Sequence, residues 1–144
     1  MRENPLIGTW TLVAWELRGE NGDGEFPFGE DAIGFLFYSP DGYMSVTIMR
    51  NNRTKFASED IMDGSIGEKA RAAETYLAYC GRYEIRGDSV IHHTAASLFP
   101  NRTGADQKRI VEVAGDRLIL STPPVQIGGR RRVSRLVWKR VSAL

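Results

Sequence analysis

The chain has 144 residues, of which 42% are hydrophobic and 26% charged, values typical of a single folded domain over residues 1–144 and not of a disordered chain. The 19 lysines and arginines nearly balance the 18 aspartates and glutamates, so the net charge of +1 gives no overall attraction to nucleic acid or anionic lipid. A lone cysteine, Cys80, excludes an internal disulfide and a multi-cysteine zinc cluster.

The N-terminal residues are too polar for a signal peptide, and no stretch approaches the ~20 apolar residues of a membrane span. We therefore expect a soluble, cytoplasmic protein without nucleic-acid or membrane partners. No glycine-rich phosphate loop follows a strand and no zinc-ligand spacing occurs, so we expect neither a cofactor nor a metal ion. The sequence leaves a homodimer open.

The first half of the chain predicts β-structure. Residues 9–17 form the first expected strand, which the glycine-rich segment 19–24 ends. Residues 33–38 and 43–49 are two apolar runs rich in β-branched and aromatic side chains. Pro40-Asp41-Gly42 lies between them, and this turn signal predicts a β-hairpin.

The middle of the chain predicts one helix over residues 65–78. Ser65 and Glu68 have the spacing of a capping box, in which each side chain satisfies a free backbone N–H at the helix start. The residues that follow are good helix formers, and an apolar stripe recurs at helical spacing: Ile66, Ala70, Ala73 and Leu77. We expect this helix to lie against or across an opening of the fold.

The second half returns to strands. Two further hairpins are expected: residues 82–86 and 89–98 around the turn Gly87-Asp88, and residues 108–113 and 117–121 around the turn Gly115-Asp116. The last expected strand, residues 133–141, follows a looser segment, 123–132. The arginines 130–132 in that segment are expected to be solvated. The total is about eight antiparallel strands with one helical insertion, which favours an up-and-down β-barrel because closure removes unpaired edges. An eight-stranded barrel can hold one small ligand.

Several motifs carry a resemblance to a known family. Gly8-Thr9-Trp10 resembles the Gly-x-Trp start of lipocalins and other calycin barrels, in which the Trp plugs the closed end and a late basic residue, here Arg140 or else Arg135, covers it. A wider set, in chain order, is similar to the bacterial and fungal lipocalin-like domain family: Leu6-Ile-Gly-Thr-Trp10, Tyr38-Ser-Pro-Asp-Gly-Tyr-Met-Ser45, Tyr79-Cys-Gly-Arg-Tyr83, His92-His93, Leu98-Phe-Pro-Asn101, Gly104-Ala-Asp-Gln107, Arg109 and Leu118-Ile-Leu-Ser-Thr-Pro123. The resemblance implies an intracellular lipocalin-like barrel. Since some members are encoded among natural-product biosynthesis enzymes, it also implies small organic ligands or substrates.

Strand alternation selects Arg109 as a candidate ligand-binding residue. Gln107 and Arg109 share a face with Val111 and Val113, so both approach the cavity if the valines fill the core. A buried guanidinium needs a negative or strongly accepting partner, which a ligand carboxylate or enolate would supply. Two alternatives remain for Arg109. Its guanidinium forms an internal ion pair with Glu84 or Asp106, or it emerges into water at the rim of the barrel.

The pair His92-His93 is the second candidate site. Neighbouring strand residues face opposite sides, so only one of them enters the barrel, and the family resemblance favours His92. An inward His near neutral pH suits general acid–base catalysis, with Tyr83 as a further catalytic candidate. The alternative is a core histidine bonded to a neighbouring hydroxyl: Thr94, Ser97 or Tyr83.

Four further residues are candidate ligand contacts. Tyr38, Tyr43 and Tyr79 offer an apolar ring with one polar tip, and Ser45 lies on the third strand. Packing in the core, or exposure to water, is the plainer interpretation of each. Alternation places Trp15 on the outer face, opposite Trp10.

Three function hypotheses follow. The first is a barrel that binds a small hydrophobic or amphipathic organic molecule. The second is a cofactor-independent isomerase, cyclase or hydratase of natural-product type, in which His92 or His93 moves a proton while Arg109 and a tyrosine stabilise an oxyanion. The third is a fully packed barrel that binds a partner through its outer face, with Trp15 in the contact. The sequence leaves the choice between carrier and enzyme undecided.

Overall fold

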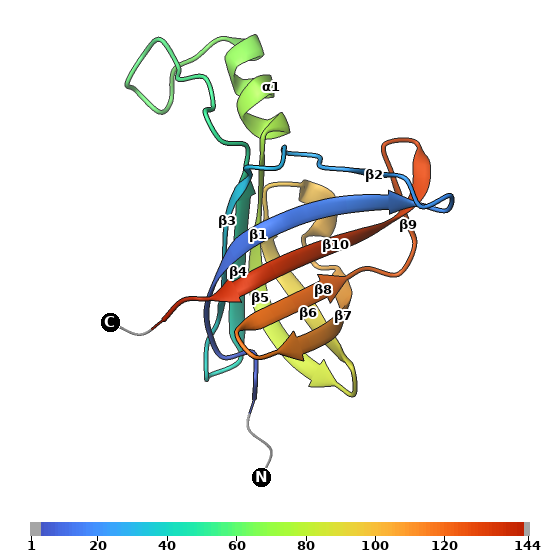
Figure 1. Cartoon of the computed structure of the whole chain (residues 1–144). Coiled ribbons are helices and arrows are strands. Elements are labelled where there is room, and N and C mark those ends of the chain that lie inside the picture. The colour runs from blue at the N-terminus through green and yellow to red at the C-terminus, as the bar shows by residue number, and fades with distance from the viewer. Residues whose placement is uncertain (1–3, 143–144) are drawn as a thin grey trace.

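The computed structural model describes residues 4–142, which fold into a β-barrel with one α-helix beyond one end (Figure 1). Ten strands and two short helices make up this part of the chain. In chain order they are β1 (Gly8–Gly19), β2 (Gly24–Glu25), β3 (Ile33–Tyr38), β4 (Tyr43–Met49), α1 (Ile66–Glu74), β5 (Tyr76–Arg86), β6 (Ser89–Ser97), the 3₁₀ helix η1 (Pro100–Arg102), β7 (Asp106–Ala114), β8 (Arg117–Ser121), β9 (Val125–Ile127) and β10 (Arg130–Arg140).

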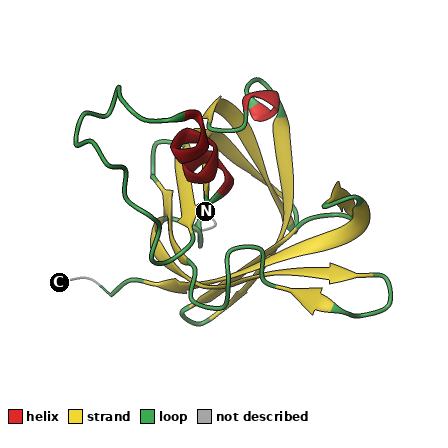
Figure 2. Cartoon of the chain, turned by 90° about the horizontal axis from the view of Figure 1, so that it is seen from above, coloured by secondary structure: helices red, strands yellow, loops and turns green. Residues whose placement is uncertain are grey.

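Eight of the strands close into the barrel. They pair in the order β1-β3-β4-β5-β6-β7-β8-β10, every pairing is antiparallel, and β10 pairs back onto β1. The short β2 adds to β1, and β9 adds to β10. Viewed from above, the strands form a ring with α1 over one side of it (Figure 2). The expected fold class, an eight-stranded antiparallel lipocalin-like barrel with one helical insertion, is confirmed.

The two ends of the barrel differ in their connections. At the end that we call closed, tight hairpins at residues 39–42, 87–88 and 115–116 join the strands. At the end that we call open, the connections are longer: residues 20–32, 50–75, 98–105 and 122–129. The open end carries α1 and η1. Any opening into the barrel interior is therefore bordered by loops and not by tight turns.

Three of the predicted strands have the observed bounds, and the others differ by their ends. Residues 33–38, 43–49 and 117–121 match β3, β4 and β8. The segment 123–132, expected to be loose, contains β9 and the start of β10. Within it, the expectation of a solvated Arg132 is wrong. Its side chain is buried, contacts Glu25 at 2.8 Å and donates to the Ile127 carbonyl.

The predicted helix is too long at its C-terminal end. The capping box between Ser65 and Glu68 is present, but α1 ends at Glu74 and Thr75 is its cap. Residues 76–78 pair with β4 instead, because sheet pairing at the barrel wall outweighs their helical propensity. The stripe residues within α1 are not buried, since no residue of α1 is, and Ile66 is 88% exposed, whereas Leu77 belongs to β5 and packs against the core.

A β-bulge in β1 reverses the expected side of Trp15. Leu12 pairs with Trp138, whereas the next pair is Ala14 with Val137, so β1 carries one extra residue at this point. An extra residue moves every later side chain to the other face. Trp15 therefore points inward beside Leu136 and packs against the core, and the expectation of an outer-face Trp15 is wrong.

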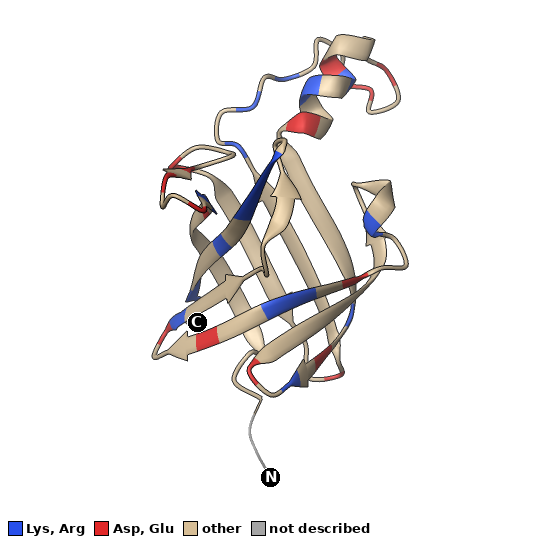
Figure 3. Cartoon of the chain, turned by 90° about the vertical axis from the view of Figure 1, so that its right-hand side faces the viewer, with Lys and Arg blue, Asp and Glu red and all other residues tan. Residues whose placement is uncertain are grey.

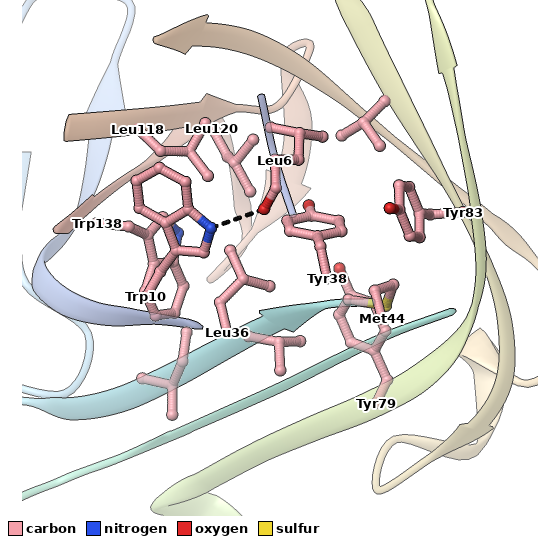
Figure 4. Packing of buried hydrophobic residues seen from close by; sticks show 13 residues of the cluster. Leu6, Trp10, Leu36, Tyr38, Met44, Tyr79, Tyr83, Leu118, Leu120 and Trp138 are labelled. Carbon is pink, nitrogen blue, oxygen red and sulfur yellow. Dashed lines mark hydrogen bonds between the residues drawn. The ribbon is translucent and has the colours of Figure 1, made fainter. Parts of the chain in front are cut away.

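Trp10 and Arg140 seal the closed end, as the family resemblance implied. Trp10 is 0% exposed, its Nε1–H donates to the Leu6 carbonyl at 2.9 Å (Figure 4), and the Arg140 guanidinium carbon lies 4.2 Å from the ring centroid. Arg140 also donates to the carbonyls of Ile7 and Pro5, each at 2.7 Å. These bonds tie the N-terminal segment across the base of the barrel.

Candidate functional site

A cavity of about 180 Å³ lies inside the barrel toward its open end. Most of its wall is apolar and comes from six strands: Trp15, Leu36, Val46, Ile48, Leu77, Leu120, Leu136 and Trp138. Val125, Gln126 and Ile127 of β9 border it as well. Its polar groups come mainly from β5, η1, β6 and β7, namely Tyr79, Arg102, His92, Gln107 and Arg109, and Thr122, Gln126 and Ser134 add polar groups on the side of β8, β9 and β10.

His92 sits at the centre of a chain of three hydrogen-bonding side chains. It points into the barrel from β6 and is 1% exposed. Its Nε2 lies 2.6 Å from the hydroxyl of Tyr38 on β3, and its Nδ1 lies 2.7 Å from the hydroxyl of Tyr79 on β5. Both ring nitrogens are therefore occupied. His92 and Tyr79 line the cavity, while Tyr38 lies outside the cavity wall, in the core.

The surroundings of His92 keep its ring neutral. Burial, together with the positive charges of Arg109 and His93, lowers the pKa of His92 to about 3. The imidazole thus carries no charge at neutral pH, and the titration between pH 5 and 8 that suits general acid–base catalysis does not occur here. Burial likewise raises the pKa of Tyr38 well above its ordinary value, so that phenol keeps its proton.

His93 faces the outside of the barrel, as alternation requires when His92 points inward. Its Nδ1 lies 2.7 Å from Asp106 and its Nε2 lies 2.8 Å from Glu84. These two carboxylates raise the pKa of His93. Glu84 and Asp106, the residues considered as partners for an inward arginine, are occupied here on the outer face.

Arg109 lines the cavity together with Gln107, as the alternation of β7 predicted. The only hydrogen bond of its side chain within residues 4–142 is to the backbone carbonyl of its neighbour Lys108, at 2.9 Å. Arg102 of η1 is the second guanidinium at the cavity, and it lies over the Tyr79 ring, 5.7 Å from the centroid. In the part of the chain that the structure describes, neither arginine makes an ion pair with a carboxylate.

The structure does not bring the remaining candidates to the cavity. Tyr43 is 51% exposed on the outer face of β4, and Ser45 shares that face because both alternate with buried Met44 and Val46. Tyr83 packs against Tyr38 at a centroid distance of 4.8 Å, and its hydroxyl donates to the Ser39 carbonyl near the closed end. We do not retain Tyr43, Ser45 or Tyr83 as site residues.

Most residues of the cavity wall were not assigned to the site from the sequence, and three of them matter most for its chemistry: Trp15, Arg102 and Trp138. Trp15 was predicted on the outer face of the barrel, because the residues around a β-bulge do not differ in type from those of a regular strand. Arg102 was overlooked because η1 is a single short turn, although Pro100 at its start is a helix-start signal. Trp138 was not among the candidate site residues. Its Nε1–H is buried and has no hydrogen-bond partner within the described residues, whereas the Nε1 atoms of Trp10 and Trp15 are both bonded.

Outside the cavity, the described part of the chain carries charged residues of both signs, and blue and red segments both occur along the ribbon in the view of Figure 3. Within residues 4–142, no three His, Cys, Asp or Glu side chains are grouped so that they could hold a metal ion. None of the helices in this range has the length and apolar content needed to cross a membrane.

Comparison with known proteins gives one family, one curated relative and similar solved structures. The family model for the lipocalin-like domain matches residues 7–141. The chain is 34% identical over 110 residues to the 4'-hydroxy-3'-methoxypropiophenone carrier protein ppsC of Aspergillus oryzae, a match that covers 70% of this chain and 99% of that protein.

Two crystal structures resemble the barrel at low sequence identity. One is a lipocalin-like protein from Bacteroides uniformis, with a TM-score of 0.50 and 13% identity over 96% of this chain and 100% of that one. The other is an uncharacterized protein from Bacteroides eggerthii, with a TM-score of 0.48 and 14% identity over 94% and 99% of the two chains. The first supports the barrel fold alone.

Proposed function

The chain belongs to the lipocalin-like domain family, and we propose that its barrel binds one small aromatic molecule that carries an accepting oxygen, such as an aryl ketone. The observation that carries the proposal is the cavity itself. It combines apolar walls with two guanidinium groups, those of Arg102 and Arg109, that have no carboxylate partner among the described residues.

The size of the cavity argues for a ligand with a single ring. A dry cavity of ~150 Å³ accommodates benzene, whereas pockets for drug-sized molecules occupy ~300–1,000 Å³. At about 180 Å³ the cavity suits a substituted benzene and is too small for a long acyl chain. It also argues against the hypothesis of a fully packed barrel that acts only through its outer face.

The charges at the cavity argue for an oxygen acceptor on the ligand. Arg102 and Arg109 are half-buried, and a ligand that displaces water from their guanidinium groups has to offer an anion or a strong acceptor in its place. Arg109 donates only to the Lys108 carbonyl, so several of its N–H groups are left for a ligand. A ketone carbonyl, a phenolate or a carboxylate would each fit this requirement.

The relative from Aspergillus oryzae supports the same class of ligand. Its name describes it as the carrier of a hydroxylated, methoxylated aryl ketone, and the match covers almost all of that protein. An aryl ketone has one aromatic ring for the apolar walls and one carbonyl for the arginines. We therefore favour a carrier for this chain as well.

The alternative of an acid–base enzyme has no observation in its favour. The two ring nitrogens of His92 are both bonded to tyrosine hydroxyls, and burial lowers the pKa of this histidine to about 3. A base with so low a pKa, and with both ring nitrogens already bonded, is a poor proton acceptor at neutral pH. His93 lies on the outer face, away from the cavity.

The experiment is isothermal titration calorimetry of the purified protein with 4'-hydroxy-3'-methoxypropiophenone and, separately, with palmitate. We expect the ketone to bind with one-to-one stoichiometry and palmitate to bind more weakly, because its chain exceeds the cavity. Absence of ketone binding to the wild type would overturn the proposal.

A pair of variants tests whether the arginine makes the contact. Arg109→Gln removes the guanidinium from the cavity, and we expect an affinity about tenfold lower, since hydrogen bonds to charged groups contribute ~1.5–3 kcal/mol. Arg109→Lys keeps the charge but loses the planar fork of donors, so it should not restore full affinity. The matched control is Lys108→Gln, which removes a positive charge from the outer face of the same strand and should leave the affinity unchanged.

A further inference from the structure

The hydrogen atoms in the Tyr38–His92–Tyr79 chain can be placed by counting donors and acceptors. Two heavy-atom contacts join these three side chains, one at each ring nitrogen of His92. A neutral imidazole has one N–H donor and one accepting nitrogen, and each phenol has one O–H. Three hydrogen atoms therefore serve two hydrogen bonds, and one O–H is left without a partner inside the chain.

Two arrangements satisfy both contacts. In the first, Nε2–H donates to Tyr38 and Tyr79 donates to Nδ1, which leaves the Tyr38 O–H free. In the second, Tyr38 donates to Nε2 and Nδ1–H donates to Tyr79, which leaves the Tyr79 O–H free. The arrangements differ in the tautomer of His92 and in which phenol has a hydrogen to offer.

The positions of the two phenols decide between the arrangements. Tyr38 is 2% exposed, is not part of the cavity wall, and has His92 Nε2 as the only partner of its hydroxyl within residues 4–142. A free O–H there would be a buried donor without an acceptor, which folded proteins avoid. Tyr79 lines the cavity, where a ligand or water can accept its hydrogen. The second arrangement leaves no buried donor unsatisfied.

We infer that the Tyr79 hydroxyl is the neutral hydrogen-bond donor to the ligand's oxygen, and that Tyr38 and His92 hold it in the donating orientation. The inference rests on the proposed function and specifies it further. Because His92 donates to the Tyr79 oxygen, that phenol becomes a better donor on its free side. The site then prefers a ligand whose oxygen accepts, such as a ketone, over one of the same shape without oxygen.

Arg102 reinforces this role of Tyr79. Its guanidinium carbon lies 5.7 Å from the centroid of the Tyr79 ring, and a cation over an aromatic face is attracted to it. A positive charge beside the phenol also favours donation of its hydrogen. Arg102, Arg109 and the Tyr79 hydroxyl thus present only donors to this part of the cavity, and a hydrogen-bond acceptor is the group that complements them.

The first test reads the tautomer of His92 and needs no ligand. The ¹⁵N chemical shifts of the imidazole distinguish a protonated ring nitrogen from an unprotonated one. We expect Nδ1 to be protonated and Nε2 to be unprotonated at neutral pH. Protonation at Nε2 instead would overturn the inference while leaving the proposed function intact.

The second test compares propiophenone with propylbenzene, which has the same carbon skeleton and lacks the carbonyl oxygen. We expect the wild type to bind propiophenone more tightly. Tyr79→Phe should lower the affinity for propiophenone about tenfold and leave the affinity for propylbenzene unchanged. Tyr43→Phe, on the outer face of β4, is the matched control and should change neither affinity.

The outcomes separate this inference from the proposed function. If wild type and Tyr79→Phe show the same preference for the ketone, the donor is another group and the inference fails, although the cavity still binds. If neither compound binds the wild type, the proposed function itself fails. Unchanged circular dichroism and melting temperature of Tyr79→Phe establish that a lost preference reflects the missing hydroxyl.

Discussion

The guanidinium of Arg140 lies over the buried indole of Trp10, with 4.2 Å between its central carbon and the ring centroid, and joins the last strand to the first. Trp10 and Arg140 are also paired across the β1–β10 seam that closes the barrel. The contact therefore lies where the sheet meets itself, and the cavity lies toward the opposite end. The Trp10–Arg140 contact thus stabilises the closed end of the barrel, and the proposed ligand site lies toward the open end.

The first prediction follows from this separation. Trp10→Ala removes a fully buried indole, and we expect it to lower the free energy of unfolding by about 3–5 kcal/mol. Thermal unfolding followed by circular dichroism measures the loss. Arg109→Ala, at the cavity, should lower the melting temperature far less. Equal melting temperatures for Trp10→Ala and the wild type would contradict the role of the indole as a plug.

Gly8→Ala probes the same contact without touching either side chain. Gly8 has φ of +132°, which side-chain-bearing residues rarely adopt, and a Cβ there would lie 2.7 Å from Arg140 Nη1. We expect a clear loss of stability, whereas Gly42→Ala, at a hairpin with open space around it, should cost only the strain of its own positive φ. A larger loss of stability for Gly42→Ala than for Gly8→Ala would contradict a fixed position of the Arg140 side chain beside Gly8.

The second prediction concerns the pH dependence that His92 imposes. Its pKa in the folded protein is about 3, below the ~6.5 of the unfolded chain, so the unfolded state binds more protons between these values. Stability is therefore lost as the pH falls from 6.5 toward 3, by about 2 kcal/mol at pH 5. Urea unfolding of the wild type and of His92→Gln at several pH values checks this prediction. The loss of stability between pH 6.5 and 3 that is due to His92 should occur in the wild type and be absent from His92→Gln.

The third prediction has the opposite sign and belongs to His93. Asp106 and Glu84 raise the pKa of His93, so the folded state holds its proton more tightly than the unfolded state does. The stabilisation is fully present below pH ~6.5 and is lost as the pH rises through the raised pKa. His93→Gln should lower the melting temperature at about pH 5.5 and have little effect above the raised pKa. A constant difference across this range would contradict the ion pairs.

The fourth prediction concerns the rim of the open end. Arg132 is buried, contacts Glu25 of β2 at 2.8 Å, and bonds to the carbonyl of Ile127 in β9. Glu25→Gln leaves this buried guanidinium without its carboxylate, which is costly. We expect faster amide hydrogen exchange in residues 125–127, which border the cavity. Glu20→Gln, in the neighbouring turn, should not change exchange there.

The hairpins were predictable because their information is local. Pro40-Asp41-Gly42 fixes a turn, and the alternation on both sides fixes which side chains of β3 and β4 face inward. The bulge in β1 was not predictable, because the extra residue is specified by pairing with β10, more than a hundred residues later. The end of α1 was missed for the same reason, since residues 76–78 are recruited by β4.

The part of the site that follows from the alternation of inward and outward side chains along a strand was predictable. The inward faces of Arg109 and Gln107 follow from the period of a strand, and the exclusion of one of the two histidines follows from the same rule. The partners of His92 do not follow, because Tyr38 and Tyr79 come from strands 54 and 13 residues away and meet only inside the closed barrel. For Tyr43 and Ser45 the sequence left open whether they line the cavity or face water, and in the structure both lie on the outer face of β4.

The most direct test of ligand binding inside the barrel is the set of nuclear Overhauser contacts between propiophenone and the protein's methyl groups. We predict contacts from the aromatic protons of the ligand to Val46, Leu120 and Leu136, which line the cavity. Saturating ligand should give no contacts to Val13 or Ile33, which are exposed on the outer face. Contacts to those outer methyl groups alone, or none at all at saturation, would contradict the account.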